Sequence, residues 1–252
     1  MNILIAGYGF VGQAHEKLLQ EQHNVMIYDP AQGYNDFPDD VVEAMIVCVS
    51  TPPAKDGTCD MSNVYDVIDK CPDVPIIIKS TISIDGWDTI QEQYKDRQIS
   101  FSPEFLRAKT AYEDLKNVDK IYIGGNNIEF WTLFKKDIVT CEPKALVLAK
   151  YFRNAFLATK VNYFNQVFDL CTALNIEYEC VRKAITDDPR IGDSHSYITE
   201  ERGFGGHCFP KDVQALLKTA EEQGIELSLI KEALEYNNIC LLYTSPSPRD
   251  RS

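Results

Sequence analysis

The sequence lacks several features that would assign a protein to a class at once. It has no apolar run long enough to span a bilayer, no CxxC pair, no His/Cys ligand spacing, no internal repeat and no signal peptide ahead of its first apolar segment. Basic residues are also scarce, with 25 lysines and arginines against 38 acidic residues and a formal net charge of -13. We therefore expect a cytoplasmic protein with reduced thiols and no metal site, and neither nucleic acid nor an anionic membrane as a partner.

A glycine-rich turn follows the first apolar segment. Residues 2–6 lead directly into Gly7, Gly9 and Gly12, spaced as GxGxxG, and then into a helical pattern. A second apolar run ends at Asp29, whose carboxylate can accept hydrogen bonds from both hydroxyls of an adenosine ribose. Together these features predict a dinucleotide site, since a glycine turn made only for packing leaves Asp29 unexplained. NAD is preferred over NADP because Asp29 would repel a 2′-phosphate.

Further short apolar runs predict a doubly wound parallel sheet. They alternate with helical or loop segments and occupy residues 45–49, 76–78, 99–101 and 121–123. Polar loops follow three of them, at residues 50–53, 79–81 and 102–107. Each loop alone could be ordinary turn chemistry. Three on one edge of a sheet indicate a cleft.

A cysteine lies within a second glycine-rich loop, residues 203–212. The glycines allow backbone amides to approach an anionic ligand, and Pro210 suits the first position of a new helix. Cys208 then precedes a helix start, where the dipole and free N–H groups favour a thiolate, and Asp212 follows on the same helix face. Cys208 is therefore predicted to be a nucleophile rather than one more buried thiol. We assign His207 no role.

Pro143 begins a helical pattern of roughly thirty residues, about 45 Å long, with apolar residues on more than one face. Such a helix is expected to be buried between domains or against a second subunit, which favours a homodimer. Within it, Lys150 and Asn154 are four residues apart and so lie on one face of the helix. This face could be exposed to solvent, or it could be directed into a cleft. Further along the chain, Arg190 could bind phosphate or pair with a neighbouring acid.

With these motifs the chain resembles the UDP-glucose/GDP-mannose dehydrogenase family, most closely its members that act on UDP-glucose. The similarity covers nearly all of residues 1–239. Its motifs are Gly7-x-Gly9-x-x-Gly12, Ser102-Pro-Glu-Phe-Leu-Arg107, Lys150-x-x-x-Asn154 and Gly205-Gly-x-Cys208-x-Pro-Lys-Asp212. The resemblance implies an α/β fold with a Rossmann-like NAD-binding domain at residues 1–142. A long central helix and a mainly helical substrate and dimerisation domain follow at 143–239, and the family's second Rossmann-like domain is expected to be missing.

The resemblance also implies a reaction and its residues. Such enzymes oxidise the C6 alcohol of a nucleotide sugar twice with two NAD, UDP-glucose becoming UDP-glucuronate, through an aldehyde held on the cysteine. Cys208 would be the nucleophile, Lys150 and Asn154 would stabilise oxyanions, and Asp212 with Lys150 would manage protons and water. Thr81 and Glu104 would assist thioester hydrolysis. The implied cofactor contacts are Gly7, Gly9, Phe10, Val11, Gly12, Asp29, Ser50, Thr51, Pro52, Ser80, Thr81 and Lys211. The implied substrate contacts are Phe105, Leu106, Arg107, Lys150, Asn154, Phe204 and Gly205.

The chain departs from the family pattern in two places. The family usually carries a second glutamate four residues after Glu104, where this chain has Ala108, so hydrolysis is expected to be slower unless another acid such as Glu113 substitutes. Residues 240–252 break the helical pattern of residues 227–239 and end in a Ser/Pro-rich string that resembles a translated sequencing adapter. We therefore expect a native chain truncated near Ile239, followed by a non-native tail.

Three alternatives stay open on the sequence. The substrate could be GDP-mannose or a UDP-N-acetylhexosamine, because the residues that read the base are expected mostly in the missing part. The chain could instead be a non-catalytic NAD-binding and dimerising module. A lysine-dependent hydroxyacid dehydrogenase would share the Rossmann half and the helical half, but it would not need Cys208.

Overall fold

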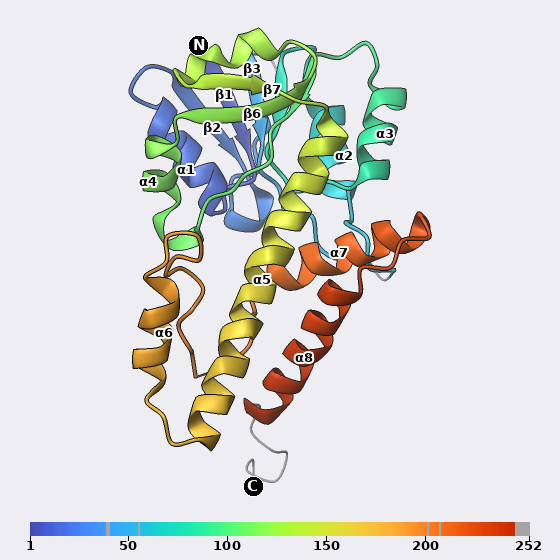
Figure 1. The fold of residues 1–252 in the computed structure, drawn as a ribbon. Coiled ribbons are helices and arrows are strands. Elements are labelled where there is room, and N and C mark those ends of the chain that lie inside the picture. Colours follow the sequence, from blue (N-terminus) through green and yellow to red (C-terminus); the bar gives the residue numbers. More distant parts are fainter. Residues whose placement is uncertain (39–40, 55, 201, 207, 245–252) are drawn as a thin grey trace, which may run out of the picture. The chain divides into compact units, whose positions relative to one another are not determined.

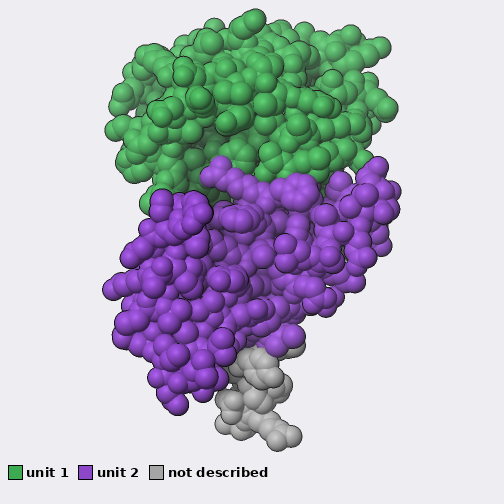
Figure 2. Space-filling view, in the orientation of Figure 1, with its two compact units in different colours: residues 1–150 green, residues 151–252 purple. Residues whose placement is uncertain are grey.

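The computed structural model describes residues 1–38, 41–54, 56–200, 202–206 and 208–244. It divides into two compact units, Met1–Lys150 and Tyr151–Ser252 (Figure 2). The division falls inside one long helix, α5 (Pro143–Ala173), so this helix contributes residues to both units. The predicted domain limits at residues 142 and 239 stay a prediction.

Unit 1 is built on a seven-stranded sheet (Figure 1). The strand order is β2-β1-β3-β4-β5-β6-β7, and β2, β1, β3, β4 and β5 are parallel to one another. The strands are β1 (Asn2–Ala6), β2 (Asn24–Tyr28), β3 (Ala44–Val47), β4 (Ile76–Ile78), β5 (Ile99–Phe101), β6 (Lys120–Gly125) and β7 (Asp137–Thr140). The predicted α/β fold with a Rossmann-like sheet is confirmed.

Apolar side chains on both faces explain why these segments form central strands. β1, β3, β4 and β5 are almost entirely buried, as expected when helices cover both faces of a parallel sheet. The helices of unit 1 are α1 (Phe10–Leu19), α2 (Ser62–Lys70), α3 (Ile84–Gln93) and α4 (Ala111–Asn117), with short 3-10 turns η1 (Pro30–Gln32), η3 (Ala108–Thr110) and η4 (Ile128–Phe134). Figure 1 shows α1 and α4 on one side of the sheet and α2 and α3 on the other.

The far end of the sheet adds one antiparallel pairing to the predicted parallel sheet. β6 pairs antiparallel with β5, and only through Ser100↔Gly125 and Phe101↔Gly124. The rest of β6 pairs in parallel with β7, a strand that the sequence did not predict. Apolar content signals that a strand forms, but it does not encode the direction of pairing. The half-exposed Asp137–Thr140 segment gives too weak an apolar signal to be recognised.

The described part of unit 2 is helical. After α5 come α6 (Tyr178–Thr186), α7 (Phe209–Glu222) and α8 (Ser228–Thr244). α5 has 31 residues, in agreement with the predicted length. The prediction that helix breaks at Cys240 is wrong, because α8 continues to Thr244 and buries Cys240. Residues 245–252 of the predicted tail lie outside the described residues. None of the helices in the described ranges is long and apolar enough to cross a membrane.

The fingerprint glycines differ in what a side chain would meet. Gly7 has φ +95°, and a Cβ there would lie 2.5 Å from the backbone of Cys48 and Val49. Gly9 has φ −71°, and a Cβ there would have no atom within 4 Å. The close approach of its backbone to that of Cys48 therefore requires a glycine at position 7, whereas packing within the fold does not require one at position 9.

We predict that Gly7→Ala lowers the free energy of unfolding by about 2–4 kcal/mol, because it combines a disfavoured φ with a backbone clash. Gly9→Ala is the matched control and should change stability by less than about 1 kcal/mol. Urea denaturation followed by circular dichroism measures both. Equal losses in the two variants would contradict this account.

Candidate active site

The GxGxxG turn and Asp29 form one hydrogen-bonded arrangement at the carboxyl ends of β1 and β2. The Tyr8 amide donates to Asp29 Oδ2 at 2.7 Å, and the Ala31 amide donates to Asp29 Oδ1 at 3.1 Å. α1 begins after Gly9 without a side-chain cap, so its first N–H groups stay available to an anion. Together with the open space at Gly9, this arrangement fits a dinucleotide whose pyrophosphate lies at the helix start.

The predicted polar loops follow neighbouring strands. β3, β4 and β5 are adjacent and parallel, so their carboxyl ends meet at one edge of the sheet. Ser50 and Pro52 are exposed there, whereas Thr51 is buried. Ser80 is also buried, and its hydroxyl donates to the Val49 carbonyl at 2.7 Å, which ties the second loop to the first. Thr81 is half-buried.

A buried ionic cluster lies at the same edge and was not predicted as a cluster. Lys79 follows β4 and Glu104 follows β5, and Lys79 Nζ lies 3.2 Å from Glu104 Oε2. Lys79 also donates to Ser102 Oγ at 3.0 Å. His15 of α1 is fully buried, with its Nε2 3.8 Å from the same Glu104 oxygen. A charged residue directly after an all-isoleucine strand is a signal that could have revealed Lys79. Nothing in the helical pattern around His15 marks its partner.

The cluster changes the proton affinities of its members. Burial lowers the pKa of His15 to about 4, with Lys79 acting in the same direction, so the imidazole is neutral near pH 7. Burial alone would raise the pKa of Glu104. The Lys79 ammonium, the charge of His15 when it is protonated and the 2.9 Å hydrogen bond from the Phe105 amide together outweigh burial, and the net direction of the pKa shift is downward. The Glu104 carboxylate is therefore largely buried, with 12% of the side chain exposed, and the Lys79 ammonium lies beside it.

Residues of the predicted Ser102–Arg107 motif have different partners. Lys150 Nζ donates to the Glu104 backbone carbonyl and lies 5.6 Å from the centre of the Phe105 ring. These contacts bring the predicted catalytic lysine to the predicted glutamate. Arg107 instead forms a bidentate pair with Asp114 of α4, at 3.0 and 2.6 Å, and its guanidinium is largely exposed. Leu106 is half-buried.

In unit 2 the predicted carboxylate, that of Asp212, is buried. Asp212 has no exposed surface, and its Oδ2 accepts a hydrogen bond from Asn154 Nδ2 at 2.6 Å. Its Oδ1 accepts from Lys211 Nζ at 2.8 Å. Cys208 is half-buried at the N-cap position of α7, as predicted, and its carbonyl accepts from the Asp212 amide at 2.9 Å. His207 lies outside the described residues.

The loop before Cys208 is anchored by a residue that the sequence did not indicate. Asn237 of α8 is 2% exposed and brackets the backbone of Phe204. Its Oδ1 accepts from the Phe204 amide at 2.5 Å, and its Nδ2 donates to the Phe204 carbonyl at 2.9 Å. The Phe204 side chain is buried, whereas Gly205 is exposed. Arg190, left open between phosphate and acid, pairs with Asp188.

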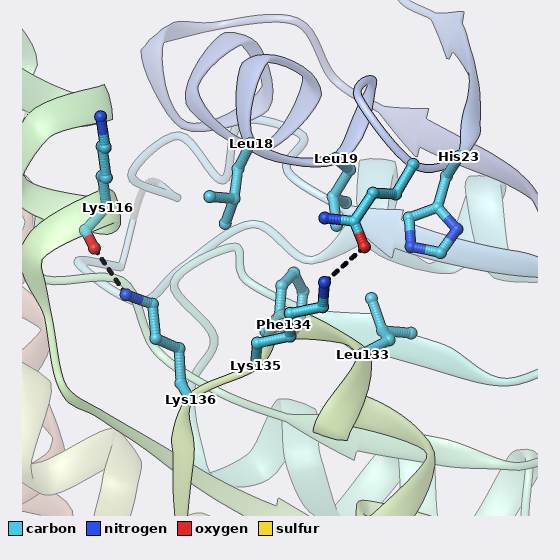
Figure 3. A pocket seen from close by; sticks show the side chains of 9 residues that line it. Leu18, Leu19, His23, Lys116, Leu133, Phe134, Lys135 and Lys136 are labelled. Carbon is cyan, nitrogen blue, oxygen red and sulfur yellow. Dashed lines mark hydrogen bonds between the residues drawn. The ribbon is translucent and has the colours of Figure 1, made fainter.

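A separate hollow in unit 1 lies at the other end of α1 (Figure 3). Lys135 donates to Gln22 Oε1 at 2.6 Å and Lys136 donates to the Lys116 carbonyl at 2.5 Å across it. Leu18, Leu19, Leu133 and Phe134 form its apolar lining. A helix of ten residues separates this hollow from the fingerprint by about 15 Å. It contains none of the predicted site residues and is not the candidate site.

We predict an acid-sensitive contribution of His15 to stability. Unfolded His15 takes up a proton near its ordinary pKa of 6.5, whereas the folded form resists it until about 4, so this contribution is complete above pH 6.5 and is lost as the pH falls to 4. Between pH 7 and pH 4, the wild type should lose about 3 kcal/mol more than His15→Gln. Urea titrations at both pH values measure this difference. Parallel losses in the two proteins would contradict it.

Comparison with known proteins assigns both halves of the chain to one family. Residues 32–136 match the "NAD binding domain" and residues 146–239 the "central domain" of the UDP-glucose/GDP-mannose dehydrogenase family. The chain is 35% identical over 219 residues to UDP-glucose 6-dehydrogenase of Rickettsia felis, covering 77% of this chain and 47% of that protein. It therefore spans about half the length of the curated relatives it matches.

Solved structures give the same fold. A UDP-glucose dehydrogenase from Pyrobaculum islandicum aligns with a TM-score of 0.80 at 25% identity, covering 94% of this chain and 68% of that one. The 3-hydroxyisobutyrate dehydrogenase of Mycobacterium tuberculosis aligns with a TM-score of 0.68 at 17% identity, covering 94% and 93%, which shows a shared fold alone. The chain belongs to the UDP-glucose/GDP-mannose dehydrogenase family, and it carries that family's NAD-binding and central domains.

Proposed function

We propose that this chain is the NAD-binding and catalytic part of an enzyme that oxidises the C6 alcohol of a nucleotide sugar to a carboxylate. The observation that carries the proposal is the thiol of Cys208 at the start of α7, one helical turn before the fully buried Asp212. A NAD site alone supports a single oxidation of an alcohol. A thiol nucleophile accounts for the second, because it keeps the aldehyde bound as a new hydride donor.

The proposed reaction consists of two oxidations followed by a hydrolysis. When bound, NAD would supply the acceptor for the hydride that is lost in each of the two oxidations, and each oxidation also releases one proton. After the first, the sulfur of Cys208 adds to the aldehyde carbon, and the resulting thiohemiacetal gives up the second hydride to become a thioester. Water then attacks the acyl carbon and the C–S bond breaks with its electron pair on sulfur. One proton of the water returns the sulfur to the thiol, and the carboxylate is released together with the other proton.

The residue roles follow from charge and hydrogen-bonding capacity. Lys150 and Asn154 supply a cation and an amide for the oxyanions that develop. Asp212, with Lys150, manages protons and water. Glu104, with Thr81, assists hydrolysis as a base, which is supported by the ionised state that Lys79 favours for this carboxylate. Glu113 is exposed on α4 and has no described contact with Glu104, so it is a weak substitute for the family's second glutamate.

We propose UDP-glucose as the substrate, because the curated relatives at 33–35% identity bear the name UDP-glucose 6-dehydrogenase. Asp29 favours NAD, since both of its oxygens already accept amides and would face a 2′-phosphate without a cation. GDP-mannose and UDP-N-acetylhexosamines are the alternative substrates, and a panel of nucleotide sugars separates them. Cytoplasmic location stays part of the proposal.

We predict that the full-length protein containing this chain forms two NADH per UDP-glucose, and that Cys208→Ser lowers turnover by about 10³-fold or more while NAD binding is kept. Cys180→Ser removes an exposed thiol of α6 and is the matched control, with unchanged turnover expected. NADH absorbance and product chromatography are the measurements. One NADH per sugar, a released aldehyde, or full turnover by Cys208→Ser would refute the thioester route. Tight NAD binding without any sugar-dependent NADH would favour a non-catalytic module.

A dimer through α5 is the proposed assembly. Large apolar side chains are exposed along one stripe of this helix at spacings of four and seven residues, which is the pattern of a surface that packs against a partner. Within unit 2 they are Phe152, Phe156, Tyr163 and Leu170, exposed by 44%, 68%, 54% and 62%.

We predict that Phe156→Glu converts this dimer to a monomer, because a charge would have to be buried in the apolar interface. Tyr122→Glu changes an exposed aromatic of β6 in unit 1 and should leave the dimer intact. Light scattering after size-exclusion chromatography reports the mass directly. A wild-type monomer, or a Phe156→Glu dimer, would contradict the proposal.

A further inference from the structure

Gln32 follows Asp29 in the short turn η1, and backbone hydrogen bonds hold it there. Asp29 and Tyr34 exchange two backbone hydrogen bonds, both of 3.0 Å. Inside this pair, the Gln32 amide donates to the Asp29 carbonyl at 3.0 Å, and the Gly33 amide donates to the Pro30 carbonyl at 3.2 Å. The turn therefore keeps the Gln32 backbone beside Asp29, and only rotation of the side chain can move its amide away.

The side-chain amide of Gln32 lies between two acceptors. Its Nε2 is 2.7 Å from the Tyr8 carbonyl oxygen and 3.2 Å from Asp29 Oδ2. A carbonyl oxygen and a carboxylate oxygen only accept hydrogen bonds, so the NH2 group, and not the amide oxygen of Gln32, must face them. Gln32 thus donates both to the glycine-rich turn and to the residue that we expect to bind the ribose.

The Asp29 carboxylate has a limited number of places for donors. Each of its two oxygens offers about two lone-pair positions. Among the described residues, Oδ2 accepts from the Tyr8 amide at 2.7 Å and from Gln32 Nε2 at 3.2 Å, which fills its positions. Oδ1 accepts from the Ala31 amide at 3.1 Å and keeps one position. While Gln32 is in place, Asp29 therefore has room for one further donor.

An adenosine ribose brings two donors, its 2′ and 3′ hydroxyls. When a carboxylate binds both hydroxyls, each donates to a different oxygen. The hydroxyl that faces Oδ1 of Asp29 finds a free position, whereas the one that faces Oδ2 meets an oxygen that is already filled. The Tyr8 and Ala31 amides belong to the backbone of the two turns and stay in place. Gln32 is the donor that can leave, because its side chain is exposed.

We propose that Gln32 occupies one of the two ribose-hydroxyl positions of Asp29 in the cofactor-free protein, and that its release sets the affinity for NAD. Binding of both hydroxyls then requires the Gln32 amide to rotate away and to lose its hydrogen bond to Asp29. A ligand with a single ribose hydroxyl uses the free position on Oδ1 and leaves Gln32 in place. The inference rests on the proposed place of Asp29 at the ribose, and not on the chemistry of the sugar.

Two ligands and two variants isolate this release. NAD carries both hydroxyls on its adenosine ribose, whereas 2′-deoxy-NAD, which lacks the 2′ hydroxyl of that ribose, carries one. Gln32→Ala removes the competing donor and keeps the backbone hydrogen bonds of the turn. Gln13→Ala is the matched control, because Gln13 Nε2 donates to the same Tyr8 carbonyl at 3.0 Å and has no hydrogen bond to Asp29 within the described ranges. Isothermal titration calorimetry of the 252-residue chain gives each Kd.

We expect Gln32→Ala to bind NAD about three- to tenfold more tightly than the wild type, because binding no longer costs a hydrogen bond. Its affinity for 2′-deoxy-NAD should equal that of the wild type. Gln13→Ala should keep the wild-type ratio of the two Kd values. Equal or weaker NAD binding by Gln32→Ala would overturn the proposal. So would an equal gain for both ligands, because the gain would then not depend on the second hydroxyl.

Asp29→Asn tests the proposed ribose site separately. An asparagine offers one acceptor oxygen in place of two, so NAD should bind about tenfold or more weakly. Wild-type NAD affinity in Asp29→Asn would refute the proposed cofactor site, and this inference with it. Loss of NAD affinity in Asp29→Asn without a gain in Gln32→Ala would overturn the role of Gln32 alone.

The release is observed directly by NMR of the chain labelled with 15N-glutamine. The side-chain NH2 signals that are missing from the spectrum of Gln32→Ala belong to Gln32. Their hydrogens should exchange with water faster after NAD is added, because a released amide is solvated, and should not do so with 2′-deoxy-NAD. Unchanged exchange at saturating NAD would contradict the release.

Discussion

The buried charge of Lys79 at the carboxyl edge of the sheet has to be compensated, and this constrains how the strands of unit 1 pair. Lys79 and Glu104 are each costly to bury alone, and removing one partner of such a pair typically costs about 3–5 kcal/mol. The register of β4 and β5 places Ile78 opposite Phe101, so the next residues, Lys79 and Ser102, come side by side. The pairing of these apolar strands thus fixes where the polar side chains that follow them lie. A two-residue slip would separate the ion pair.

Unit 2 repeats this arrangement with different elements. Asp212 is fully buried, and it is compensated by an amide from α5 and an ammonium from the adjacent Lys211. Both buried carboxylates therefore have one cation and at least one neutral donor. At Glu104 the Lys79 ammonium lowers the pKa and favours the ionised form, which is the state in which a carboxylate can accept a proton.

Much of the fold and part of the site could be predicted from the sequence. Glycine spacing and the acid after the second strand form a known nucleotide-binding pattern, which the sequence shows directly. The structure gives each a cause, because the Cys48 backbone lies against Gly7 and Asp29 accepts the Tyr8 and Ala31 amides. The position of Cys208 before a helix has a local cause, since Pro210 marks the helix start.

Contacts between residues that are far apart in the sequence could not be predicted from it. The reversed direction of β6 depends on two residue pairs with β5. The contact of His15 with Glu104 joins residues 89 positions apart, and the bond from Lys150 to the Glu104 carbonyl joins residues 46 apart. Arg107 reads as an available cation in the sequence, but it is occupied by Asp114. Hydrophobic periodicity carries no information about such pairings.

The bracket that Asn237 places around Phe204 links two segments that are 33 residues apart. This side chain shields the Phe204 amide from solvent. The amide can therefore exchange its hydrogen only when the hydrogen bonds between Asn237 of α8 and Phe204 break. The loop that carries the nucleophile and the last described helix should therefore open together, as one cooperative unit of local unfolding. The position of the Cys208 sulfur therefore depends on α8, a helix that does not itself contain a reactive group.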